Sequence, residues 1–99
     1  MKLYAYRAYS PSRQIIVDQG SFYAKSRDTM RARIAREQLG NEVSVFEVPE
    51  KPSQMKDSPK FIGRVLSLAT LAPTWYTPEG DIYSFNRITG KLYGKKRWD

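Results

Sequence analysis

The sequence predicts a small α+β fold. Segments in which polar and apolar residues alternate, as they do along half-buried strands, occur in both halves of the chain. Residues 27–39, which lie between the second and the third of these segments, space their apolar side chains as an amphipathic helix does. With 99 residues the chain is long enough for one hydrophobic core and too short for two, so we expect a single domain over residues 1–99.

Residues 1–48 are predicted to form a ββαβ unit. Residues 2–9 alternate as a strand does, and residues 14–24 form a second extended segment after a short turn, so the two most simply pair as an antiparallel hairpin. Ser26 is a good N-cap for the helix that follows it. Residues 43–48 alternate again and complete the unit as a third strand.

The predicted helix has one broad apolar arc, formed by Met30, Ala32, Ile34, Ala35 and Leu39. Arg33 and Arg36 fall outside this arc, where they could face a phosphate backbone or only solvent. Arg31 intrudes on the arc, so we expect its aliphatic stem to be buried and its guanidinium to reach water.

The middle of the chain is harder to interpret. Residues 49–60 hold three prolines and many charges, which predicts a surface loop or linker. Residues 61–71 are predicted as a second helix, because apolar residues recur at i, i+3, i+4 and i+7 from Ile62 onward. A strand is the alternative for residues 59–71, since Gly63 disfavours a helix and the following residues also alternate.

The C-terminal part of the chain, residues 74–99, predicts a three-stranded antiparallel meander with a basic tail. Glycine-containing turns separate its strands. The strands are expected at 74–77, 82–86 and 91–97, with turns at 78–81 and 87–90.

Composition favours a binding protein over an enzyme. The chain has no cysteine and no histidine, which removes disulfides, thiolate metal clusters, the usual zinc ligands and the most common general base. We therefore expect no cofactor and no metal. The first ten residues lack the apolar run of a signal peptide, and no stretch approaches the roughly 18 apolar residues of a membrane span. The expected location is cytoplasmic, with no membrane partner.

The net charge of +7 points to a polyanionic partner. Residues 51–99 carry nine basic and four acidic groups (+5), whereas residues 1–50 carry eight and six (+2). The expected partner is nucleic acid, DNA or RNA. The alternative is an acidic protein surface, docked by a small inhibitor or adaptor through an edge strand and the basic tail.

The candidate binding residues combine aromatic rings with cations, because bases stack on rings while phosphates pair with ammonium and guanidinium groups. Most of them lie in the meander and its tail, and two lie on the helix. Ordinary core packing of the rings and a solubilising role for the cations are the competing interpretation. The candidates are Tyr83, Arg87, Lys91, Tyr93, Lys95, Lys96, Arg97 and Trp98, with Arg33 and Arg36.

Residues 82–94 resemble the signature hairpin of the GIY-YIG nucleases. This resemblance covers about 13 of the 99 residues and implies a pair of tyrosines, Tyr83 and Tyr93, near a scissile phosphate. Asp81 stands where the family has glycine, and the family's arginine-bearing helix and metal-binding glutamate have no counterpart after Gly94. We therefore expect no nuclease activity from this hairpin.

Overall fold

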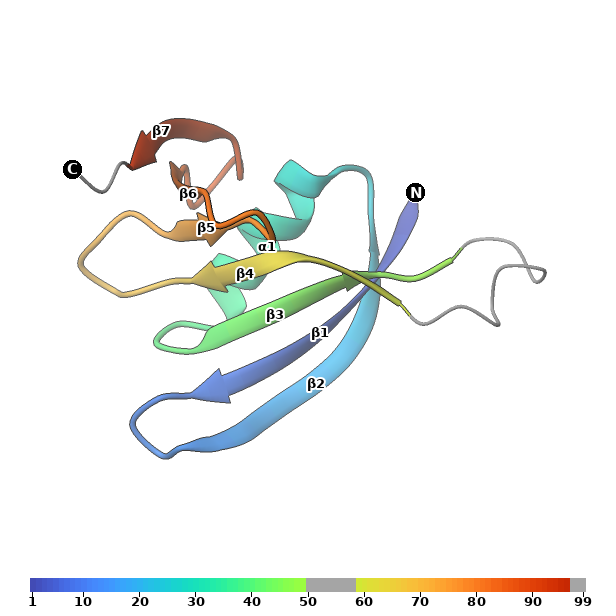
Figure 1. Cartoon of the computed structure of the whole chain (residues 1–99), viewed down its shortest axis with the longest axis horizontal. Coiled ribbons are helices and arrows are strands. Elements are labelled where there is room, and N and C mark those ends of the chain that lie inside the picture. The colour runs from blue at the N-terminus through green and yellow to red at the C-terminus, as the bar shows by residue number, and fades with distance from the viewer. Residues whose placement is uncertain (50–58, 97–99) are drawn as a thin grey trace.

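The computed structural model describes residues 1–49 and 59–96. These residues form one seven-stranded antiparallel sheet and one helix (Figure 1). The predicted loop over 49–60 falls almost entirely outside the described residues. The elements are β1 (Lys2–Ser10), β2 (Ile15–Ala24), α1 (Arg27–Glu37), β3 (Glu42–Glu47), β4 (Lys60–Leu66), β5 (Thr74–Tyr76), β6 (Ile82–Phe85) and β7 (Leu92–Lys96).

The strands lie in the order β2-β1-β3-β4-β5-β6-β7. β1 and β2 form the predicted hairpin, α1 then crosses one face of the sheet, and β3 pairs with the free side of β1. From β3 onward each strand pairs with the next one in the chain. The predicted ββαβ unit and the predicted C-terminal meander are thus both confirmed, and β4 joins them into a single sheet (Figure 1).

The hydrophobic core lies between α1 and one face of this sheet. Because side chains alternate along a strand, every second residue of β1, β2 and β3 faces the helix, and the others point away from it. Met30, Ile34 and Ala35 supply the helix side of the core. The strands supply Tyr4, Ala8, Phe22, Ala24, Val43, Val45, Ile62, Val65, Trp75 and Phe85.

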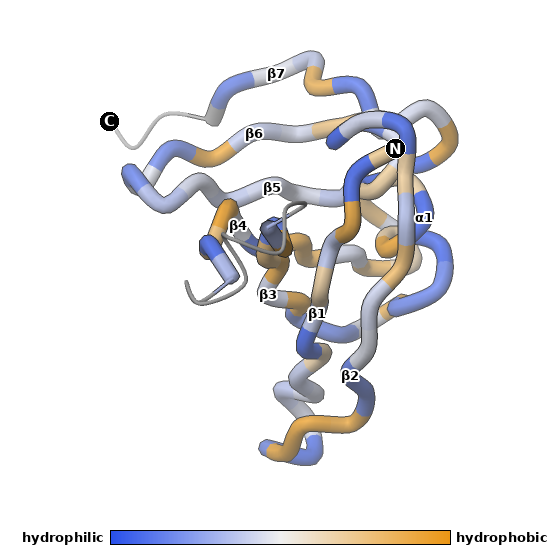
Figure 2. The backbone as a smooth tube through the Cα atoms, turned by 90° about the vertical axis from the view of Figure 1, so that its right-hand side faces the viewer, coloured by the Kyte–Doolittle hydropathy of each residue, from blue (hydrophilic) through white to orange (hydrophobic). Residues whose placement is uncertain are grey.

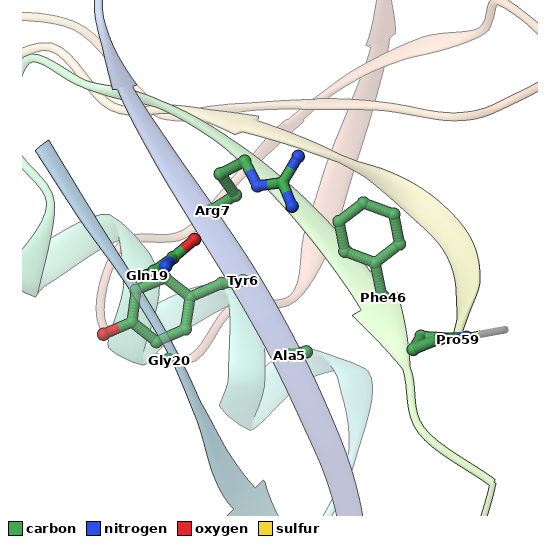
Figure 3. A pocket seen from close by; sticks show the side chains of 7 residues that line it. All are labelled: Ala5, Tyr6, Arg7, Gln19, Gly20, Phe46 and Pro59. Carbon is green, nitrogen blue, oxygen red and sulfur yellow. The ribbon is translucent and has the colours of Figure 1, made fainter. Parts of the chain in front are cut away.

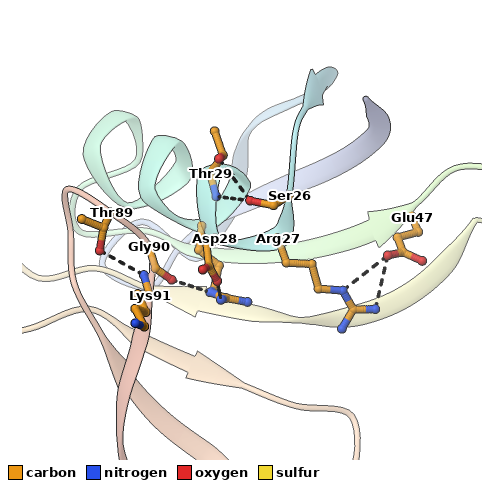
Figure 4. A network of polar contacts seen from close by, with 9 residues as sticks. Ser26, Arg27, Asp28, Thr29, Glu47, Thr89, Gly90 and Lys91 are labelled. Carbon is orange, nitrogen blue, oxygen red and sulfur yellow. Dashed lines mark hydrogen bonds and ion pairs between the residues drawn. The ribbon is translucent and has the colours of Figure 1, made fainter.

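The cap predicted for the helix is confirmed. The Ser26 hydroxyl accepts a hydrogen bond from the Thr29 amide at 3.2 Å, which satisfies one of the free amides at the start of α1 (Figure 4). Leu39, which we expected on the apolar arc, lies beyond the end of the helix and is 52% exposed.

The second helix predicted over residues 61–71 is wrong. The strand alternative is confirmed for Lys60–Leu66, which form β4, whereas residues 67–71 are neither helix nor strand. A β-bulge explains the misleading pattern. Val45 pairs with Gly63 but the next residue, Phe46, pairs with Phe61, so Ile62 is an extra residue. The bulge turns both Ile62 and Val65 toward the core, which reproduces the three-residue spacing of a helix.

Arg31 also departs from expectation, because its guanidinium is not in water. The side chain is buried, donates to the Gly90 carbonyl at 3.0 Å and pairs with Asp28. It also lies 5.3 Å from the centre of the Trp75 ring. Burial lowers the pKa of Arg31, while the charge of Asp28 opposes that effect. Arg31 therefore links α1 to the β6–β7 turn through its hydrogen bond to Gly90.

Candidate nucleic-acid interface

The face of the sheet turned away from α1 is accessible across β2, β1, β3 and β4. On β5 and β6 the same face is less accessible, because Thr74 and Ile82 are buried there. We call the accessible surface the open face. Its residues are Leu3, Ala5, Arg7, Tyr9, Ile16, Gln19, Ser21, Tyr23, Glu42, Ser44, Phe46, Phe61, Arg64 and Leu66, with Tyr76 of β5 at its border.

An aromatic pair lies near the middle of the open face. Phe46 on β3 is the cross-strand neighbour of both Ala5 on β1 and Phe61 on β4. The rings of Phe46 and Phe61 are 5.7 Å apart at 60°, an edge-to-face contact. Ala5 and Phe46 line a groove of about 670 Å³, whose other walls include Gly20 and Pro59 (Figure 3).

A row of polar and cationic residues runs beside the aromatic pair. Cross-strand pairing sets Arg7 next to Ser44, Ser44 next to Arg64, and Arg64 next to Tyr76. Gln19 extends the row onto β2. Arg7 lines the same groove as Phe46, and Figure 3 shows the two side chains next to each other on adjacent strands.

The two guanidinium groups of this row differ in their surroundings. Arg64 pairs with Glu42 and lies 5.4 Å from the centre of the Tyr76 ring. Arg7 is exposed and has no ion pair or side-chain hydrogen bond within residues 1–49 and 59–96. Glu42 is the one acidic residue of the open face as defined above, so the charge of this surface is positive.

Arg36 and Arg87 do not lie on the open face. They lie where α1 packs against the β6–β7 turn. Arg87 donates to the carbonyls of Leu68 at 2.6 Å and Leu71 at 2.8 Å, and also to Ser67. Arg36 donates to the carbonyls of Arg87 and Ile88 at 3.3 and 3.1 Å. Both guanidinium groups therefore bind backbone acceptors of the protein itself.

Arg33 and Lys95 also have intramolecular partners. Arg33 pairs with Glu37 at 3.0 Å and lies 4.2 Å from the centre of the Phe22 ring. Lys95 pairs with Asp81 at 3.2 Å, and its ammonium is 5.9 Å from the centre of the Tyr83 ring.

Of the remaining candidates, Lys91 and Tyr93 are exposed, Tyr93 by 64%. Lys96 ends β7. Arg97 and Trp98 lie outside the described residues. The described candidates are thus distributed over β6, β7 and α1, and the structure does not bring them together on the open face.

Sequence reasoning missed Arg7, Phe46, Phe61 and Arg64. Alternation assigns Arg7 and Phe46 to the outward side of their own strands. Their proximity arises from the pairing of β1 with β3 and of β3 with β4, which joins residues far apart in the chain. No local pattern in the sequence carries that information.

Asp18 lies on the helix side of the sheet, where it joins β2 to β1 and to the end of α1. Its carboxylate accepts hydrogen bonds from the Tyr6 hydroxyl at 2.9 Å and from the Gln38 amide at 2.8 Å. These bonds lower the pKa of Asp18, and the bond from Tyr6 has the larger effect. Burial, followed by the bond to Asp18, raises the pKa of Tyr6.

The geometry defines a sheet with a helix on one side and a surface of rings and guanidinium groups on the other. No family model, curated protein or solved structure matches this chain. Within the described ranges, His, Cys, Asp and Glu side chains nowhere gather in a group of three that could hold a metal ion. Over the same ranges, none of the helical structure is long and apolar enough to cross a membrane.

Proposed function

We propose that this protein is a binding protein that holds single-stranded nucleic acid on its open face. The observation that carries this proposal is the adjacency of the Phe46–Phe61 pair and the row that contains Arg7 and Arg64. Bases stack on exposed rings without regard to sequence, while phosphates pair with neighbouring guanidinium groups.

A single strand fits this surface better than a duplex. The rings of Phe46 and Phe61 lie on a sheet, and only unpaired bases present a face to such rings. DNA and RNA share the base and phosphate chemistry that the open face recognises, so the proposal covers both.

The basic C-terminal segment enters the proposal as a second point of contact. Lys95, Lys96, Arg97 and Trp98 combine cations with a ring, as the open face does. Consecutive cations add affinity for phosphate without sequence preference.

Fluorescence anisotropy tests the open face directly. A labelled single-stranded DNA or RNA is titrated with the unmodified protein and with the variants Phe46→Ala and Arg7→Ala. Loss of a stacking ring costs about 1–3 kcal/mol of binding free energy. Tyr93→Ala is the matched control, because Tyr93 is an exposed ring on β7, away from the open face. We expect it to bind as the unmodified protein does.

Two further variants separate the contribution of the row that contains Arg64 to binding from that of the basic C-terminal segment. Glu42→Gln removes the acid that pairs with Arg64, so we expect tighter binding if phosphate approaches this row. A triple alanine variant at Lys95, Lys96 and Arg97 measures how much of the binding free energy the basic segment contributes. Equal binding by the Phe46→Ala, Arg7→Ala and unmodified proteins would refute the open face as the interface. Absence of binding by all proteins would direct the search to an acidic protein partner.

A further inference from the structure

β2 is an outer strand of the sheet, so one side of its backbone has no neighbouring strand among the described residues. The Val48 amide donates to the Leu3 carbonyl at 3.0 Å, which shows that the odd residues of β1 direct their backbone groups toward β3. The even residues of β1 therefore bond to β2. By the same alternation, Gln19, Ser21 and Tyr23 direct their amides and carbonyls outward.

The two outer strands differ in how they are protected against pairing. β7 is five residues long and ends in two lysines, which discourage a further strand. β2 is ten residues long and contains no lysine, arginine or proline. Its one charged residue, Asp18, is hydrogen-bonded to Tyr6 and Gln38 on the helix side.

Apolar side chains are exposed at both ends of β2. Ile16 near its start is 47% exposed, and Tyr23 near its end is 61% exposed. Both point to the open face, because Ile16 pairs with Tyr9 and Tyr23 pairs with Leu3. Figure 2 shows the hydrophobic start of β2 at the far end of the β1–β2 hairpin, away from α1.

We propose that β2 pairs antiparallel with β2 of a second copy of this chain, about a two-fold axis beside Gly20. This register sets Gln19 opposite Ser21 of the second copy, so the outward backbone groups bond to one another. The bulge at Val17 shifts the register by one residue, which brings Ile16 opposite Tyr23 on both sides of the axis. β2 is thus complementary to itself.

The same register sets Asp18 opposite Phe22 of the second copy. The Phe22 ring lies 4.2 Å from the guanidinium of Arg33, which is itself paired with Glu37. Each Asp18 carboxylate therefore approaches an ion pair of the other copy. Because the axis is perpendicular to the sheet, the two open faces lie on the same side of a continuous sheet. The proposal does not depend on nucleic-acid binding.

Sedimentation equilibrium of the unmodified protein without nucleic acid tests the dimer. We expect a mass twice that of the 11.5 kDa chain. Ser21→Pro removes an outward amide and leaves the bonds to β1 in place, so we expect a folded monomer. A monomer up to the solubility limit of the unmodified protein would overturn the proposal, as would a dimer that persists in Ser21→Pro with an unchanged circular dichroism spectrum.

Charged variants test the register. Ile16→Lys and Tyr23→Glu should each give a monomer, because each places a charge against an apolar side chain. The double variant should dimerise again, since each lysine then faces a glutamate of the other copy. Within one chain the two positions are roughly 23 Å apart along the strand, too far to pair. A double variant that remains monomeric would overturn the register.

Discussion

Asp18 shows how a single carboxylate connects three elements. It lies on β2 and accepts hydrogen bonds from Tyr6 on β1 and from Gln38 at the end of α1. Since the bond from Tyr6 is the main cause of its lowered pKa, we expect Tyr6→Phe to raise the pKa of Asp18 toward its ordinary value. An NMR titration of the Asp18 carboxyl carbon measures this change.

The sign of the pH effect on stability follows from the lowered pKa of Asp18. The folded protein holds the ionised carboxylate more strongly than the unfolded chain does. The stabilisation is therefore complete above the unfolded pKa and is lost as the pH falls through the folded pKa. We expect the difference in urea midpoint between the unmodified protein and Asp18→Asn to shrink over that range. A difference independent of acid pH would contradict this assignment.

At the scale of elements, the β6–β7 turn is fixed to the first turn of α1. Gly90 has a φ of +76°, and a Cβ at this position would lie 1.6 Å from the Asp28 carbonyl oxygen (Figure 4). We expect Gly90→Ala to lower the free energy of unfolding by about 3 kcal/mol or more, because positive φ and a backbone collision act together. Urea denaturation measures the loss.

Gly80→Ala is the control for this prediction. Gly80 has a φ of +93°, but a Cβ there would meet nothing within 4 Å. Its substitution therefore reports the conformational strain alone, which we expect to cost about 1 kcal/mol. Similar losses for Gly80→Ala and Gly90→Ala would show that the turn does not pack on α1 as described.

The elements themselves were largely predictable, whereas their irregularities were not. Alternation located the strands of both halves, and the cap at Ser26 located the start of α1. The bulge at Ile62 concealed β4, because a residue added to a strand changes the face of those beyond it. Whether a strand contains a bulge depends on its neighbours, and these are settled by tertiary pairing.

At the scale of the whole molecule, composition gave the sign of the charge but not its distribution. Among the predicted cations, Arg33, Arg36, Arg87 and Lys95 bind partners within the protein, which a count of charges does not reveal. The open face is assembled from β1, β2, β3 and β4, with Tyr76 of β5 at its border, and the order of these strands depends on the crossover of α1. Its residues could be assigned to an outward side, but their proximity could not be predicted.

The salt dependence of binding distinguishes the open face from the charge of the whole molecule. For single strands, log affinity falls with log salt by about 0.7 per neutralised phosphate. We expect Arg7→Ala to reduce that slope by about 0.7, because it removes one phosphate contact. Lys91→Ala removes an exposed cation of the β6–β7 turn and should leave the slope unchanged. Anisotropy titrations at several salt concentrations give both slopes. Equal reductions for the two variants would mean that phosphates respond to the net charge of +7 rather than to the arrangement of residues on the open face.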